Sequence, residues 1–349
     1  MSEHASKTAI YGAAAANLVI ACLKAGGAAI TGSASMASEA VHSLVDTGNQ
    51  MLLLLGLAQA AKEPDAKHNF GYGGAMFFWV LVVGVCIFGL GASVSFYEGF
   101  HKLSNPGPLD ANSYDLIGWI HPTLGNVLPA VPAWALNLGI LTLAILAEGK
   151  SCAIAVAAFA KESSDKGMWR ALRESKDPTV PAVIVEDSAA VAGLVVAFAC
   201  QALAYSLEIP ALDAIGSIII GVLLAGAAAF LIIECRSLSM NEAIDPDAVS
   251  EIMELVEAHP KITKVCEIKT THMGPTTVLV CLSVDFTDSM NARQIETAVG
   301  HLRLQVEEIL ARIYGRTMMA DVYINVESFK TFGEGFLPEA EEEENAEKE

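Results

Sequence analysis

Two ionisable residues, His42 and Asp46, lie four positions apart inside an apolar stretch that covers residues 35–56. Positions i and i+4 share one face of a helix, so the imidazole and the carboxylate can converge on a single point. An ionisable group at membrane depth costs about 2.5–3.5 kcal/mol on insertion scales and usually marks an ion or proton pathway. The pair therefore predicts a cation site inside a membrane helix.

A second pair of ionisable residues, the carboxylates Glu186 and Asp187, lies in another apolar segment, residues 180–206. Adjacent residues of a helix point about 100° apart, so only one of the two can face a given centre directly. Counting about 1.5 Å per residue places His42 and Asp46 about 10–17 Å from one membrane edge and Asp187 about 10 Å from the opposite edge. Because the hydrocarbon core is about 30 Å thick, Asp46 and Asp187 can meet near its middle.

One imidazole and two carboxylates suit Zn²⁺, and also Mn²⁺, Fe²⁺ or Co²⁺, whereas an all-oxygen Ca²⁺ site would not need the histidine. Protons compete for these ligands, and an imidazole titrates near neutral pH, so His42 can exchange a proton for a metal ion. The purely structural alternatives are a hydrogen-bonded His42–Asp46 pair that ties helices together and Asp187 as a helix-end partner. For Glu186, the alternative to metal binding is that its side chain faces water or a loop cation.

The composition predicts an integral membrane protein. Of the 349 residues, 53% are hydrophobic and only 17% are charged, whereas a soluble protein is about one-quarter charged. Six segments reach the roughly 20 apolar residues that a span needs: 9–30, 35–60, 76–98, 132–159, 180–206 and 210–233. Between the third and fourth of these, residues 112–129 are too short and broken for a span and suit an interfacial or re-entrant piece on the outer side. Three charged residues within or beside the spans are expected to snorkel or to be paired rather than to bind metal: Lys24, Glu148 and Lys150.

The loop charges predict the orientation. One set of loops carries almost all of the cations: Lys7, Lys62, Lys67, Lys161, Lys166, Arg170, Arg173, Lys176 and Arg236. By the positive-inside rule, both termini are then cytoplasmic. The net charge of −19 and the lack of a basic stripe argue against nucleic-acid binding. The short amino-terminal segment, with no targeting sequence in it, suits a bacterial inner membrane.

The remainder of the chain divides into a soluble domain, residues 235–330, and an acidic tail, residues 331–349, after a membrane domain of residues 1–234. Asp245 and Pro246 predict the start of a helix, and Val249, Ile252 and Val256 form its buried face. Strands follow at 264–270 and 277–286, then an amphipathic helix from Ile295 to Ile313, and a last strand with Val322, Ile324 and Val326 on one face. The order αββαβ predicts a small α+β domain of ferredoxin-like type.

Several stretches together resemble the cation diffusion facilitator family of zinc and divalent-metal/proton antiporters. They are the run from Gly32 to Gln50, His68-Asn-Phe-Gly-Tyr-Gly73, Asp213-Ala-Ile-Gly-Ser217 and His272-Met-Gly-Pro275. The segments 169–181 and 186–191 resemble the zinc transporter 9-like branch. The resemblance implies six spans, a homodimer, and a cytoplasmic domain that dimerises and often binds further metal.

The resemblance also implies a transport site made by His/Asp-x-x-x-Asp on the second and fifth spans. His42, Asp46 and Asp187 match this pattern, but the fourth position falls on Val183, which cannot bind metal. Glu186, water or a neighbouring side chain could complete the site, and the metal preference could then shift from zinc towards manganese, iron or cobalt. In the soluble domain the last strand lacks the His-x-Asp of some members, and the remaining candidates for regulatory metal are His259, His272, His301 and Asp285.

The leading hypothesis is therefore efflux of a divalent cation, Zn²⁺ in the first place and Mn²⁺, Fe²⁺, Co²⁺ or Cd²⁺ otherwise, in exchange for protons across a lipid bilayer. The alternatives are an antiporter selective for Mn²⁺, Fe²⁺ or Co²⁺ and, because of Val183, a transport-inactive relative that acts as a metal-responsive scaffold. An enzyme is disfavoured, since the chain has no HExxH or comparable hydrolase motif. A passive channel is disfavoured because one ligand cluster suits a carried ion rather than multi-site conduction.

Overall fold

A computed structural model describes residues 17–29, 32–105, 113–114, 131–162, 167–314 and 319–327. These residues form two compact units. The first is helical and comprises residues up to Ala61 and Ala75–Arg236. The second comprises Lys62–Gly74 and the chain from Ser237 onward, so the loop between the second and third predicted spans belongs to it.

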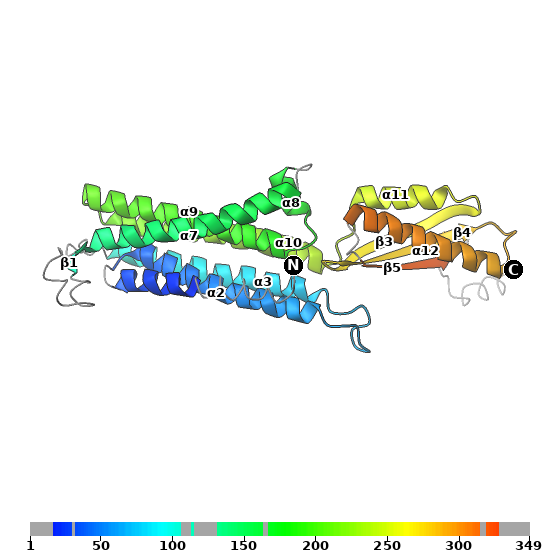
Figure 1. The fold of residues 1–349 in the computed structure, drawn as a ribbon, viewed down its shortest axis with the longest axis horizontal. Coiled ribbons are helices and arrows are strands. Elements are labelled where there is room, and N and C mark those ends of the chain that lie inside the picture. The colour runs from blue at the N-terminus through cyan, green and yellow to red at the C-terminus, as the bar shows by residue number, and fades with distance from the viewer. Residues whose placement is uncertain are drawn as a thin grey trace, which may run out of the picture. The chain divides into compact units, whose positions relative to one another are not determined.

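The helical unit is built from long apolar helices (Figure 1). After a helix at Asn17–Ala29, the chain forms α2 (Ala34–Ala60) and a continuous rod made of α3 (Ala75–Cys86), the π-helical turn η1 (Ile87–Ala92) and α4 (Ser93–Ser104). Two short strands, β1 (Ser113–Tyr114) and β2 (Val131–Pro132), pair antiparallel. The remaining helices are α7 (Ala133–Glu162), the short α8 (Met168–Glu174), α9 (Thr179–Leu207) and α10 (Ala211–Ser239).

Four helical segments within the described residues are long and apolar enough to cross a membrane: Ala75–Ser104, Trp134–Lys161, Thr179–Leu207 and Ala211–Ser239. They coincide with four of the six predicted spans. The second predicted span forms the 27-residue helix α2, whose polar residues lower its hydropathy. The described part of the first is the shorter helix Asn17–Ala29. Most of the predicted interfacial piece lies outside the described residues.

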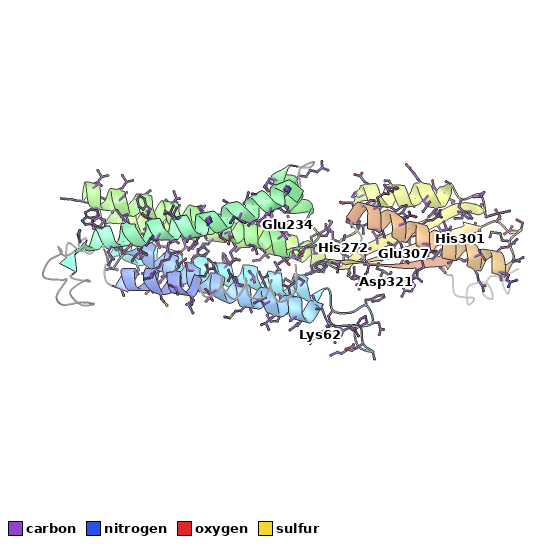
Figure 2. The ribbon with its side chains drawn as sticks, in the orientation of Figure 1. Lys62, Glu234, His272, His301, Glu307 and Asp321 are labelled. Atoms are coloured by element: carbon purple, nitrogen blue, oxygen red, sulfur yellow. The ribbon has the colours of Figure 1, made fainter. Side chains whose placement is uncertain are left out.

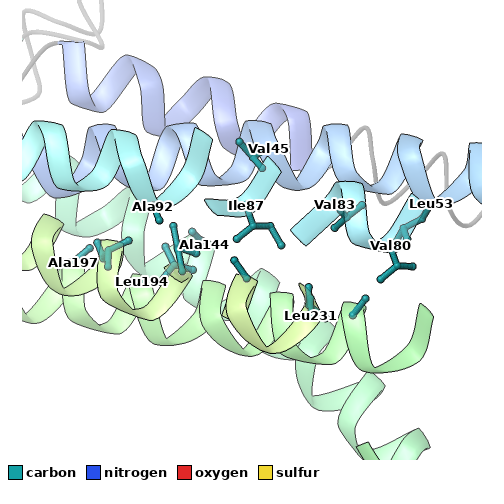
Figure 3. Packing of buried hydrophobic residues seen from close by; sticks show 14 of the residues in the cluster. Val45, Leu53, Val80, Val83, Ile87, Ala92, Ala144, Leu194, Ala197 and Leu231 are labelled. Atoms are coloured by element: carbon teal, nitrogen blue, oxygen red, sulfur yellow. The ribbon is translucent and has the colours of Figure 1, made fainter. Parts of the chain in front are cut away.

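The helices pack around an apolar core in which side chains of several elements interdigitate (Figure 3). Val80 and Val83 of α3 and Leu194 of α9 are completely buried. On the outer surface large apolar side chains are exposed, among them Leu143 and Leu146 of α7, each 66% exposed. Such a surface is suited to lipid, because lipid-facing helices satisfy their backbone internally and present apolar side chains outward.

The second unit contains α11 (Pro246–Glu257), β3 (Ile262–Gly274), β4 (Thr277–Phe286), α12 (Ala292–Tyr314) and β5 (Met319–Val326), in the predicted order αββαβ. The strands form one mixed sheet in the order β3-β4-β5, in which β3 pairs antiparallel and β5 pairs parallel to β4. The two helices contact each other, α11 contacts β3 and α12 contacts β5. Their contacts bury one face of the sheet, with alternate residues of β4 from Val278 to Phe286 in the core.

The predicted buried face of α11 is confirmed for Ile252 and Val256, which are fully buried, and Val322 of β5 is 5% exposed. Two apolar residues at the ends of α12 and β5 are more exposed. Ile313 is 38% exposed and Val326 is 47% exposed. Both lie at the last or next-to-last position of an element, where the covering partner has ended, so alternation continues beyond the core. The predicted acidic tail lies outside the described residues.

Hydrogen bonds to Asp65 link several residues within the loop Lys62–Gly74. Both oxygens of Asp65 accept hydrogen bonds, Oδ1 from the backbone N–H groups of Lys67 and His68 and Oδ2 from the Tyr72 hydroxyl at 2.7 Å. The Tyr72 hydroxyl and these N–H groups hold the pKa of the Asp65 carboxyl below its usual value. At the end of the loop the backbone of Gly73 lies against that of Gly274, at the end of β3.

Candidate metal site

The helix α2 carries an unusual number of buried polar side chains on an otherwise apolar rod. Among them, Ser38 and Thr47 satisfy their hydroxyls on backbone carbonyls four residues earlier, those of Ala34 and Ser43. The rest of the set recurs every three or four residues, and a helix places such positions on one face. This face comprises Ser35, Glu39, His42, Ser43 and Asn49, all buried, with the partly buried Asp46 among them.

His42 and Asp46 lie together on this face. The His42 side chain is 1% exposed, and its Nδ1 lies 3.3 Å from Oδ1 of Asp46. Within the part of the chain that the structure describes, neither ring nitrogen of His42 nor Oδ1 of Asp46 has a hydrogen-bond partner. Burying unsatisfied polar atoms is unfavourable, so an imidazole nitrogen and a carboxylate oxygen left without such partners at this depth suit the binding of a cation.

Glu186 of α9 meets this pair from the opposite side of the interface between α2 and α9. It is 6% exposed and accepts a hydrogen bond at 2.7 Å from Nδ2 of Asn49. Its carboxyl group is also within hydrogen-bonding range of the Asp46 carboxyl. Two buried carboxylates cannot remain in contact while both are charged, so either a proton or a cation must lie between them.

Asp187 faces a different neighbour. Its side chain is half-buried and interacts with Glu148 of α7 and with the adjacent Glu186. Val183 packs against the apolar core, as its side chain requires. Among the described residues, no three His, Cys, Asp or Glu side chains are close enough together to hold a metal ion. Chelation by the four predicted residues therefore requires the α2 and α9 side chains to converge further.

The amino terminus of α2 is tied to two other helices through Asp213, the third residue of α10. Oδ2 of Asp213 accepts from the backbone N–H of Ala34 at 2.7 Å and pairs with Nζ of Lys102 at 3.0 Å. Oδ1 accepts from the hydroxyls of Ser33, at 2.8 Å, and Ser35. These contacts fix the position of the helix that carries His42 and Asp46.

Glu39 and Ser43 belong to the same buried surface but were not among the candidates from sequence. Glu39 lies three positions before His42. It could have been identified by the same signal, an ionisable residue in an apolar helix. Lys24 was expected to snorkel or to be paired; it is paired and completely buried. Its partners lie outside the four-residue site.

A family comparison bears directly on this arrangement. The model of the cation efflux transmembrane domain matches residues 10–238, which include every residue of the candidate site. The chain belongs to the cation diffusion facilitator family. Members of the cation efflux family are transporters and not enzymes, so this chain is an integral membrane protein of a transporter family.

Two similar members of the cation efflux family are mitochondrial proton-coupled zinc antiporters named SLC30A9, from Xenopus laevis and Homo sapiens. They are 36% and 33% identical to this chain over 258 residues, which is 73% of the chain and 42% of each relative. The metal tolerance protein C4 of Arabidopsis thaliana is 30% identical over 295 residues, 83% of the chain and 58% of that protein. The chain thus spans about half the length of these relatives and falls in the zinc transporter 9-like branch of the cation efflux family.

The metal candidates in the second unit of this cation efflux protein are dispersed. His272 on β3 is 2% exposed and lies edge-on to Tyr314, while His301 is exposed on α12 (Figure 2). In the register of β3 and β4, Asp285 lies opposite Lys264, at the other end of the strand pair from His272. His259 accepts a hydrogen bond from the backbone N–H of Lys261 through Nδ1. In the described part of this unit the four residues do not form a ligand group.

Proposed function

We propose that this protein exports a divalent metal ion, Zn²⁺ by preference, across a membrane in exchange for protons. The transported ion binds between α2 and α9, with His42 and Asp46 supplied by one helix and Glu186 and Asp187 by the other. The observation that carries the proposal is the His42–Asp46 pair, whose ring nitrogens and Oδ1 have no hydrogen-bond partner among the described residues, together with its interaction with the Glu186 carboxyl group of α9. The SLC30A9 relatives are named proton-coupled zinc antiporters, which supports both the ion and the coupling.

Proton coupling follows from the contact between Asp46 and Glu186. When the metal leaves, the two carboxyl groups must take up at least one proton to remain in contact in an apolar surrounding. When the metal returns, that proton must leave, since the same oxygens bind the metal. Metal and proton therefore occupy the site alternately, and movement of the helices would carry them in opposite directions.

Ion selectivity is part of the proposal. With Val183 in place of a fourth ligand, the site supplies one nitrogen and three carboxylates of which only part can bind at once. Such a nitrogen- and oxygen-rich site also accepts Mn²⁺, Fe²⁺, Co²⁺ and Cd²⁺, so these ions are the expected competitors of Zn²⁺.

We extend the proposal to the architecture in which this site works. It comprises six spans in a membrane domain of residues 1–234, a ferredoxin-like domain of residues 235–330 that holds a homodimer, and an acidic tail. The distribution of loop lysines and arginines supports an orientation with both termini in the cytoplasm. The proposed membrane is a bacterial inner membrane.

Transport by the purified full-length chain in liposomes tests the function. A zinc-sensitive dye and a pH-sensitive dye inside the vesicles should report Zn²⁺ movement coupled to opposite proton movement. His42→Ala should abolish both signals. His101→Ala, which removes an exposed histidine from α4, is the matched control and should leave both unchanged. Zinc flux that is indifferent to an imposed pH gradient would contradict antiport.

The second candidate function, a transport-inactive scaffold that responds to metal, is motivated by Val183 and by the absence of a three-ligand group among the described residues. It predicts saturable Zn²⁺ binding that depends on His42, with no flux of metal or protons in the same vesicles. The two functions are thus separated by comparing binding with flux on one preparation.

A further inference from the structure

A lysine is completely buried in the helical unit beside the candidate metal site. Lys24, on the helix Asn17–Ala29, donates from Nζ to Oε2 of Glu39 at 3.2 Å and to Oγ of Ser43 at 2.7 Å, both on α2. The same ammonium group donates to Oε1 of Glu148 on α7 at 3.0 Å. Three helices therefore meet at one charge, and all three ammonium hydrogens have acceptors.

The charges of this cluster do not cancel. One ammonium faces two carboxylates, and among the described residues Oε1 of Glu39 and Oε2 of Glu148 have no hydrogen-bond partner. Buried ion clusters are weak contributors to stability, because the cost of desolvating the charges offsets their attraction. A cluster of this kind in an apolar bundle suggests a role in function rather than in stability.

The cluster is placed where it can act on the metal site. Ser43, which accepts from Lys24, is adjacent to His42, and Glu39 precedes His42 by one helical turn. Lys24 interacts electrostatically with His42 and Asp46, and Glu148 interacts with Asp46 and Asp187. The charges of the cluster thus come from the helix Asn17–Ala29, α2 and α7, while the proposed ligands lie on α2 and α9.

A glycine on α9 makes room for the cluster. A Cβ at Gly193 would lie 2.6 Å from Oε1 of Glu39, which is closer than non-bonded atoms can approach. The Glu39 carboxylate therefore reaches the surface of α9, the helix that carries Glu186 and Asp187. The point of contact, Gly193, is six positions beyond Asp187.

We propose that Lys24 is a positioning residue that sets the affinity of the metal site, with Glu39 and Glu148 as its counter-ions. The inference rests on the proposed function only for the identity of the site, since it concerns equilibrium binding. The Lys24 ammonium opposes entry of a divalent cation and keeps binding weak enough for release. The two carboxylates attract the cation and hold the ammonium at a fixed place. A low-dielectric surrounding makes each charge effective over several ångströms.

Calorimetric titration of the purified full-length protein with Zn²⁺ tests this arrangement. Lys24→Gln should tighten Zn²⁺ binding by about tenfold, because a nearby positive charge is removed. Glu39→Gln should weaken it by about tenfold, because a negative charge is removed. Lys24→Arg should restore the wild-type affinity, and Lys24→Gln combined with Glu39→Gln should return close to it.

Two controls identify the site and the charge effect. His42→Ala should remove the Zn²⁺ binding signal, which shows that the heat comes from this site. Lys150→Gln removes an equal charge from an exposed position of α7, two residues from Glu148, and should leave the affinity unchanged.

The directions in which the two variants change the Zn²⁺ affinity decide the outcome. A cluster that only holds the helices together would weaken binding in both single variants, and shifts of Lys24→Gln and Glu39→Gln in the same direction would overturn the proposal. Opposite shifts in a protein that moves no metal in liposomes would support the role of Lys24 while contradicting the proposed antiport. A wild type that binds no Zn²⁺ would overturn both.

Discussion

The side-chain amide of Asn49 donates to the carboxylate of Glu186 at 2.7 Å, although the two residues are 137 positions apart in the chain. The bond joins the face of α2 that carries His42 and Asp46 to α9. It orients the Glu186 carboxyl group towards Asp46, with which that group is also in contact. Asn49 thus acts on the site without being a metal ligand.

Replacing Asn49 by Ala should weaken Zn²⁺ binding by about 10–100-fold, the usual effect of removing a group that orients a metal ligand. The carboxylate would lose its donor and rotate away from Asp46. Calorimetric titration measures the change. Asn17→Ala, which removes an amide from the partly exposed helix Asn17–Ala29, is the control. An unchanged affinity in Asn49→Ala would show that Glu186 needs no orientation or does not bind the metal.

Glu186 and Asp187 should differ in their effect on transport. Because Glu186 contacts Asp46 while Asp187 interacts with Glu148, Glu186→Gln should reduce the initial rate of Zn²⁺ flux by at least about tenfold, and by more than Asp187→Asn does. Both variants keep the size of the side chain and remove its charge. The flux measured in liposomes ranks them, and a larger loss in Asp187→Asn would indicate that α9 rotates before it binds the ion.

Asp213 should matter for stability more than for metal affinity. Its carboxylate accepts from the Ala34 backbone and from Lys102, Ser33 and Ser35, so Asp213→Asn should lower the free energy of unfolding by about 1.5–3 kcal/mol. Thermal unfolding in detergent measures the change as a lower transition temperature. Glu208→Gln, at an exposed position between α9 and α10, is the control and should have little effect. Equal transition temperatures for Asp213→Asn and wild type would contradict the anchoring role.

The Tyr314 hydroxyl should ionise only at strongly alkaline pH, and the stability of the second unit should fall when it does. Burial raises the pKa of its hydroxyl to about 12, and this oxygen accepts a hydrogen bond at 2.8 Å from the backbone N–H of Asp245. The folded protein thus favours the neutral phenol, so the stability gained is fully present below the ordinary tyrosine pKa of about 10. It is lost as the pH rises through about 12. The tyrosinate absorbance of wild type minus that of Tyr314→Phe should rise near pH 12, and a rise near pH 10 would contradict the prediction.

The contact between Gly73 and Gly274 should tolerate no side chain. A Cβ at Gly274 would lie 2.7 Å from the Cα of Gly73, and backbone atoms cannot move aside as a flexible side chain can. Gly274→Ala should therefore destabilise the second unit by about 1–3 kcal/mol and increase hydrogen exchange in Lys62–Gly74. Gly300→Ala on α12 is the matched control, since a Cβ there meets nothing within 4 Å. Unchanged exchange in the loop would contradict the contact.

The sequence was sufficient to predict the order of helices and strands from α11 to β5 in the second unit. Alternation of apolar residues from Val278 to Phe286 predicts β4 with its correct bounds, and Asp245-Pro246 predicts the start of α11. Both signals are local, because a strand repeats every two residues and a proline restricts its own backbone. Periodicity does not reveal where the covering element ends, so the exposure of Ile313 and Val326 follows only from the tertiary structure.

In the helical unit, too, the sequence determined the local properties of the charged side chains. The sequence by itself determined that His42 and Asp46 share a helix face, that Val183 cannot bind a metal, and that Lys24 must either snorkel or be paired. These conclusions require only helix geometry and the cost of a charge in an apolar medium.

Only the tertiary structure decided which groups meet. Glu186 and Asp187 point about 100° apart, so the rotation of α9 about its axis selects Glu186 as the neighbour of Asp46. Lys24 finds Glu148, 124 positions away, and Asp213 reaches Ser33 across 180 positions. Such contacts depend on how whole helices pack, which is a property of the complete interface and not of any local pattern.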